Sequence, residues 1–289
     1  MKIFCFLILT LLSSFAKLTV ASVNPIATDL LRQIGGDKIE IVEIVRPGMD
    51  VHAFQPHSKD IRKLEDCQAI FAMGKGLEPY LAKISDALGP QTAIVELGRT
   101  LPSLKIDADP VYACCPAHSR GAIDPYWWHN VKNMARVTKV VAKALSTLDG
   151  NHKEFYKANA NVARKQYRDL HNWVKGQISM IPKKNRILVT AHVAFAYFCK
   201  EYGFEAAYVQ GLSKEGNIST QTLAKTVEDL KRKELKAVFP EQMANPKVLK
   251  QIAKATGAKV GAPLYADHIK TTYKDMVFYN IKAITSALR

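Results

Sequence analysis

Residues 151–181 contain no proline and carry apolar residues at helical spacing, which predicts one helix roughly 45 Å long. Asn151 is expected to cap this helix, with Glu154 completing a capping box, and Pro182 is expected to end it. A helix of this length exceeds what one small lobe needs, so we expect it to join two lobes. A long core helix inside a single domain would leave the same pattern. The expected apolar face contains Phe155, Ala158, Val162, Tyr167, Leu170, Val174 and Ile178.

Short apolar runs alternate with helical patterns on both sides of this helix, which is typical of parallel α/β sheets. Among the helices, one is expected to be capped by Ser58 and another to cover residues 77–88. The predicted fold is α/β, with two lobes at residues 17–150 and 182–289, each a parallel sheet flanked by helices, joined by the helix at 151–181. No sequence repeat relates the halves. The predicted strands are residues 18–23, 38–45, 69–73, 92–97, 186–190, 205–209, 237–239 and 259–261.

Residues 1–16 have the features of a secretory signal peptide: Lys2, an apolar run, and small residues before position 17. We expect cleavage after Ala16 rather than after Ala21, because the later cut would remove the first strand. Cys5 lies outside a context for lipid attachment. The expected product is a soluble exported protein.

The net charge of +15 over 289 residues is spread along the chain, and the longest basic run is Lys-Arg-Lys at 231–233. Such scatter argues against a nucleic-acid partner and favours a cationic, solvated surface. Beyond the N-terminus, no apolar run is long enough to span a membrane. We expect a monomer.

Four cysteines remain after the expected cleavage, and an exported protein can form disulfides whose pairing the sequence leaves open. Cys67 and Cys199 lie in apolar helical patterns and are expected to be buried thiols. Cys114 and Cys115 are adjacent in a loop with His118. They form either a reactive or metal-contacting pair, or disulfides with other cysteines.

Polar side chains follow several of the predicted strands: His52, His192, Glu241 and Asp267. Ligands of open α/β sheets bind beyond the carboxyl ends of the strands. Imidazole and carboxylate together suit zinc or another first-row divalent metal. Because these residues lack local ligand spacing, each could equally be an ordinary solvated side chain.

Five ordered segments extend the pattern: GMDVHAFQP at 48–56, DPYWW at 124–128, TAHVAFAYF at 190–198, AVFPEQ at 237–242 and PLYAD at 263–267. With them the chain resembles the zinc/manganese substrate-binding proteins of bacterial ABC transporters. The resemblance implies a periplasmic protein that captures a divalent metal ion between two lobes and passes it to an inner-membrane ABC permease.

The resemblance also implies site residues. His52, His192 and Asp267 correspond to metal ligands, and Glu241 to a supporting residue. A histidine at position 192 is usual in zinc binders, where manganese binders often have glutamate. The ion implied is therefore Zn²⁺, with Mn²⁺ as the alternative.

The chain departs from the family pattern at one ligand, because Tyr126 stands where the family has histidine. A phenol titrates near 10 and binds zinc poorly unless the metal lowers its pKa. His129 lies three residues further on and is the expected replacement. Tyr126 itself, a loop residue or water are the alternatives.

Two other functions fit the same residues. One is a zinc-dependent hydrolase in which Glu241 is the general base, although we do not expect an enzyme. The other is a relative that binds a metal chelate or acts as an adhesin, which the altered ligand at Tyr126 favours.

Overall fold

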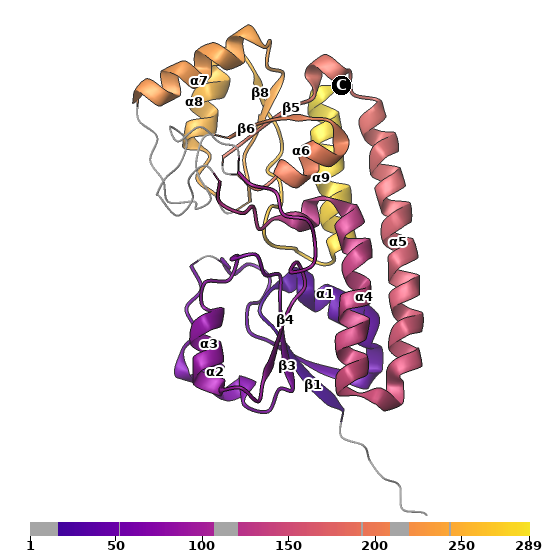
Figure 1. Cartoon of the computed structure of the whole chain (residues 1–289). Coiled ribbons are helices and arrows are strands. Elements are labelled where there is room, and N and C mark those ends of the chain that lie inside the picture. The colour runs from indigo at the N-terminus through magenta and orange to yellow at the C-terminus, as the bar shows by residue number, and fades with distance from the viewer. Residues whose placement is uncertain (1–16, 52, 107–120, 192, 209–219, 243) are drawn as a thin grey trace, which may run out of the picture.

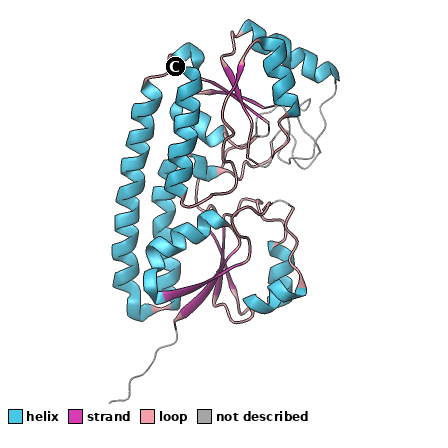
Figure 2. Cartoon of the chain, turned by 180° about the vertical axis from the view of Figure 1, so that it is seen from behind, coloured by secondary structure: helices cyan, strands magenta, loops and turns pink. Residues whose placement is uncertain are grey.

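Two α/β lobes are stacked along a set of long helices (Figure 1). The computed structural model describes residues 17–51, 53–106, 121–191, 193–208, 220–242 and 244–289. Helices α4 (Val131–Leu148), α5 (Lys153–Ser179) and α9 (Tyr273–Leu288) run along one side of the molecule, as Figure 2 shows from behind. The predicted fold class, two parallel-sheet lobes joined by a long helix, is confirmed. The exact lobe boundaries stay a prediction.

The N-terminal lobe contains a four-stranded parallel sheet in the order β2-β1-β3-β4. Helices connect the strands, as parallel pairing requires. The elements are β1 (Leu18–Ser22), α1 (Pro25–Gly35), β2 (Ile39–Glu43), α2 (Ser58–Leu64), β3 (Ala69–Ala72), α3 (Leu81–Leu88) and β4 (Ala93–Glu96).

The C-terminal lobe repeats this topology, with a parallel sheet in the order β6-β5-β7-β8. The same strand order therefore occurs twice although the sequence shows no repeat. The central strands of each lobe end where the lobes face each other (Figure 1). The elements are β5 (Ile187–Thr190), α6 (Ala196–Tyr202), β6 (Glu205–Tyr208), α7 (Thr220–Arg232), β7 (Ala237–Phe239), α8 (Lys247–Thr256) and β8 (Lys259–Val260).

Helix α5 packs on both lobes. In its first half the Asn159 side chain donates a hydrogen bond to the Ile34 carbonyl of α1 at 3.1 Å. In its second half the Trp173 ring meets Phe278 of α9 edge to face, with centroids 4.5 Å apart. One continuous apolar core also extends from β1 of the first lobe to Phe239 of the second. Because one helix is fixed to both lobes, hinge motion at its middle is restricted.

The buried face of α5 differs from the predicted one. Val162 is 58% exposed and Ala158 is also exposed, so both were wrongly assigned to the core. The buried residues instead recur in steps of three and four, as expected for packing between antiparallel helices. They are Tyr156, Ala160, Ala163, Tyr167, Leu170, Val174 and Ile178, together with His171.

Three predicted helix starts are also wrong. Asn151 lies in a 3-10 turn before α5 instead of capping it, and Glu154 pairs with Lys157. Ser58 is the first residue of α2, and the cap position is His57. Helix α3 begins at Leu81. It does not extend back to Leu77 because Pro79 disfavours helical backbone at Glu78.

Cys67 and Cys199 are buried free thiols, as predicted. Burial raises the pKa of the Cys67 thiol to about 11, so this side chain is inert at neutral pH. Cys114, Cys115 and the expected signal peptide lie outside the described residues. Within the described ranges, no helix is both long and apolar enough to cross a bilayer.

Candidate metal site

Glu241 links the two central strands of the C-terminal lobe at the edge that faces the other lobe. It follows β7, and its Oε1 accepts a hydrogen bond from the backbone N–H of Ala191, just after β5, at 3.0 Å. The side chain is 2% exposed. Residue 191 is the last before the predicted ligand His192. Glu241 therefore fixes the backbone that leads into this position, and its support of a metal ligand stays a prediction.

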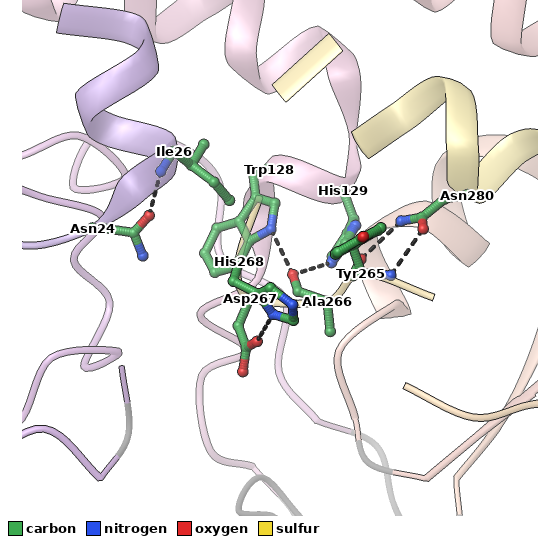
Figure 3. A network of polar contacts seen from close by, with 9 residues as sticks. All are labelled: Asn24, Ile26, Trp128, His129, Tyr265, Ala266, Asp267, His268 and Asn280. Atoms are coloured by element: carbon green, nitrogen blue, oxygen red, sulfur yellow. Dashed lines mark hydrogen bonds and ion pairs between the residues drawn. The ribbon is translucent and has the colours of Figure 1, made fainter. Parts of the chain in front are cut away.

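The segment that carries Asp267 continues the sheet beyond β7. Leu264 forms an isolated parallel bridge with Glu241 and exchanges backbone hydrogen bonds of 2.8 Å with Pro240 and Gln242. Asn280 of α9 then binds both backbone groups of Tyr265, at 2.9 and 2.8 Å (Figure 3). The backbone is thus held on both sides as it approaches Asp267.

The Ala266 carbonyl, directly before Asp267, is the meeting point of two more side chains (Figure 3). Trp128 Nε1 donates to it at 3.0 Å and His129 Nε2 lies 2.8 Å from it. Because a carbonyl oxygen only accepts, the Nε2 of His129 carries the proton. The 3-10 turn η4 (Trp127–His129) therefore positions Asp267 through its neighbour.

Asp267 is buried, with 3% of its surface exposed. One carboxylate oxygen lies 3.1 Å from Nδ1 of His268, whose ring packs edge to face on Tyr265. A contact with imidazole orients a carboxylate, as is common around metal sites. His268 was not recognised from the sequence.

Tyr126 lies fully buried beside the acidic side chains of this region. Its backbone N–H donates to Asp124 at 2.7 Å, and its ring meets Trp128 edge to face at 5.3 Å. Burial raises the pKa of the phenol well above its ordinary value, and the nearby carboxylates raise it further. In order of effect these are Asp267, Asp124, Glu241 and Asp50. The phenol is thus neutral without a cation, and a divalent cation would oppose the effect of the carboxylates.

His129 has different surroundings. Its ring stacks against Phe195 with centroids 4.3 Å apart and borders an apolar cavity of about 20 Å³ between α5, α6 and α9. The structure brings Tyr126, Asp267 and Glu241 into one electrostatic neighbourhood and directs the Nε2 of His129 to a backbone carbonyl. That His129 binds a metal stays a prediction.

His52 and His192, the two other predicted ligands, lie outside the described residues. Among the described residues there is no cluster of three or more metal-ligating side chains. The described residues next to these positions include Ala191, which is bound by Glu241, and the role of both histidines stays a prediction.

The other tryptophan of the turn connects it to the N-terminal lobe. Trp127 Nε1 donates to the carbonyl of Met73, after β3, at 3.0 Å. A side chain at Gly98 would place its Cβ 2.3 Å from this nitrogen, so only glycine fits there. Glu78 fixes the same loop, because its carboxylate accepts from the backbone N–H groups of Met73 and Gly74 at 2.8 and 3.0 Å. Residue 126 is thus held to the N-terminal lobe through Trp127 and to the C-terminal lobe through Trp128.

Glu78 should make stability depend on pH. Burial raises the pKa of its carboxyl from the ordinary 4.5 to about 7. Between these values the folded protein binds more protons than the unfolded chain, so the free energy of unfolding should fall as pH rises from about 4.5 to about 7. Glu78→Gln should remove this slope, measured by denaturant unfolding at a series of pH values. Glu65→Gln, which changes an exposed carboxyl, should keep it; an unchanged slope in Glu78→Gln would contradict the assignment.

Two lobes of equal topology, a rigid connecting helix and acidic side chains gathered where the lobes meet define a two-lobed binding protein. A family model described as zinc-uptake complex component A, periplasmic (ZnuA), matches residues 19–287. The chain belongs to this family.

Similar proteins cover almost the whole chain. The manganese-binding lipoprotein MntA of Bacillus subtilis (strain 168) is 27% identical over 288 residues, which is 96% of this chain and 92% of the relative. The manganese ABC transporter substrate-binding lipoprotein PsaA of Streptococcus pneumoniae serotype 4 is 28% identical over 286 residues, covering 96% and 91%.

Solved structures share the fold. The periplasmic zinc binding protein TroA from Treponema pallidum superposes with a TM-score of 0.83 at 24% identity, over 94% of this chain and 99% of that one. A manganese-bound periplasmic metal binding protein from Candidatus Liberibacter asiaticus gives 0.84 at 22%, over 95% and 100%.

This protein is therefore a metal-binding substrate-binding component of an ABC transporter, and it is not an enzyme. The hydrolase alternative considered from the sequence is wrong. The role of the Glu241 carboxylate is to hold the backbone N–H of Ala191.

Proposed function

We propose that the protein captures zinc between its lobes in the periplasm and delivers it to an inner-membrane ABC permease. The observation that carries this proposal is that backbone contacts bring the segments of Tyr126, Glu241 and Asp267 together: Leu264 forms a bridge with Glu241, and Trp128 binds the carbonyl of Ala266. Glu241 holds the residue before His192, and η4 holds the residue before Asp267. Such support on both sides suits ligands that must keep a fixed geometry.

In this proposal the metal ligands are His52, His192 and Asp267, and the residue at position 126 is the fourth ligand. Two imidazoles and one carboxylate with a fourth ligand make a closed tetrahedral site, which holds zinc without leaving a catalytic position open. We favour Tyr126 over His129 at the fourth place because only Tyr126 lies among the carboxylates. The Nε2 of His129 is engaged with the Ala266 carbonyl.

Manganese is the second candidate. The relatives MntA and PsaA are named for manganese, and Tyr126 replaces a nitrogen ligand by an oxygen. Oxygen ligands suit manganese better than imidazole does. The proposed pair of imidazoles is the feature that favours zinc.

Competition between the two ions tests the choice. Metal-free protein loaded with Mn²⁺ should release it when an equimolar amount of Zn²⁺ is added, because first-row divalent ions bind N/O sites in an order that places manganese lowest. Elemental analysis after gel filtration measures both ions. Retention of manganese against equimolar zinc would overturn the zinc assignment, and binding of neither ion would overturn the proposed site.

Export and oligomeric state complete the proposal. We propose that residues 1–16 are removed as a signal peptide and that the mature protein acts as a monomer in the periplasm. The family description places its members there. Relatives named as lipoproteins offer membrane attachment as the alternative to a freely diffusing protein.

A further inference from the structure

Helices α4 and α5 carry an unusual share of the positive charge. Residues 131–179 contain ten lysines and arginines against three aspartates and glutamates, a net charge of +7 out of +15 for the chain. Helix α4 contains no acidic residue. In the sequence these charges look scattered, but the antiparallel arrangement of the two helices brings them together in space.

A groove of about 490 Å³ lies between the two helices, on the half that is nearest their connecting turn. Lys139 and Lys143 line it from α4, and Lys153 and Lys157 line it from α5. Each pair is four residues apart, so both side chains of a pair are on the same helix face. Small side chains, Ala142 and Ala160, leave the floor open.

Most of this charge has no internal partner. Lys157 pairs with Glu154 at 2.7 Å and Lys153 also attracts this carboxylate, whereas Lys139 and Lys143 make no ion pair with any described residue. The other acidic side chain at this end, Asp149, already binds His152 and Tyr156. Like charges four residues apart destabilise a helix, so this arrangement is unfavourable unless an external anion neutralises it.

One hydroxyl in the groove is also without a partner. Ser146 Oγ is buried and makes no hydrogen bond within the described part of the chain. Buried polar atoms are normally satisfied, and such exceptions call for a missing partner. Because this hydroxyl lies beneath the surface of the groove, the exposed lysine ammonium groups are the ones that an external anion can contact.

The turn between α4 and α5, next to which the groove lies, is at the same end of the molecule as the point where the chain enters β1 (Figure 1). Lys38 lies between α5 and β1. Its ammonium is 5.6 Å from the ring centroid of Phe155 in α5, and the next residue, Ile39, pairs with Leu18 of β1. Lys17, at the start of β1, is exposed and adds positive charge at this end. The metal site is at the opposite end of α4.

We propose that this lysine groove docks the molecule on the phosphate groups of an anionic phospholipid surface. A membrane surface fits better than a single soluble phosphate, because the charge extends beyond the groove to the start of β1. Docking in this way leaves the space between the lobes open. It is independent of which metal the site binds.

Vesicle sedimentation tests this proposal with vesicles of equal parts phosphatidylglycerol and phosphatidylcholine, and with pure phosphatidylcholine. Wild type recovered after export should bind the first and not the second, and binding should weaken steeply towards about 0.15 M salt. The groove variant Lys139→Gln/Lys143→Gln/Lys153→Gln should lower the partition coefficient about fivefold per lysine removed. All proteins share one N-terminus, so its contribution cancels.

The matched control removes the same charge from α8 of the other lobe, where Lys247, Lys250 and Lys254 are exposed. Lys247→Gln/Lys250→Gln/Lys254→Gln should bind vesicles like wild type. Equal loss in both triple variants would show a net-charge effect and overturn the proposal, as would absence of wild-type binding. Pyrophosphate binding without vesicle binding would also overturn it, because the groove would then serve a soluble anion. Zinc affinity should be unchanged in both variants.

Discussion

Asp267→Asn is expected to weaken zinc binding by about 100-fold or more. Loss of a residue that only supports a ligand already costs 10- to 100-fold in typical metal sites, and a ligand's own charge should matter at least as much. Asparagine keeps the shape of the side chain, and the backbone of the two residues before it is held by Asn280, Trp128 and His129. The variant should therefore fold, which separates loss of charge from loss of structure.

Isothermal titration of metal-free protein with zinc measures this effect, and thermal unfolding checks the fold. Asp275→Asn is the control, because this carboxylate lies eight residues further on, is exposed, and accepts from the Thr271 and Thr272 hydroxyls. It should leave zinc affinity unchanged. Wild-type affinity in Asp267→Asn would exclude this residue from the site.

Most of the fold could be predicted from the sequence because the strands and helices of a parallel α/β lobe have simple hydrophobic patterns. Buried parallel strands are short apolar runs, and the connections between them are helices with one apolar face. The strand at 237–239 has the predicted bounds. The common topology of the two lobes was not predictable, because strand order depends on packing between elements and leaves no repeat in the sequence.

Errors occurred where tertiary contacts decide between similar local patterns. Val162 suits a core position as well as Ala163 does, but packing of α5 against α4 buries Ala163 and exposes Val162. Asn151 is a good helix cap by type, yet the chain makes a 3-10 turn there because the hairpin with α4 must close. Propensity is a weak prior against such contacts.

Only part of the candidate site could be read from the sequence. Carboxylates and histidines after strands mark Glu241 and Asp267. The role of the Ala266 carbonyl, which Trp128 and His129 both contact, could not be predicted, because every residue has a backbone carbonyl whatever its type. Asn280 gives a weak signal, because it is a polar side chain at a buried position of a mostly apolar helix face.

Substitutions at Tyr126 and His129 should distinguish their roles. If position 126 completes the site, Tyr126→His should keep or tighten zinc binding, because an imidazole is a better zinc ligand than a neutral phenol. Tyr126→Phe removes the oxygen and should weaken zinc binding about tenfold or more. Titration with zinc measures the affinity of both variants. The pH is kept constant because histidine ligands protonate near 6.5, which itself lowers zinc affinity.

His129 is the matched case. His129→Gln retains an N–H donor that can reach the Ala266 carbonyl, so zinc affinity should stay close to wild type. His129→Ala removes the donor, opens a cavity beside Phe195 and leaves Asp267 less well held, so both stability and affinity should fall. If His129 were itself a ligand, glutamine would be as damaging as alanine and Tyr126→Phe would have no effect. The glutamine variant decides the question, because it preserves the hydrogen bond and removes only the capacity of an imidazole to bind the metal.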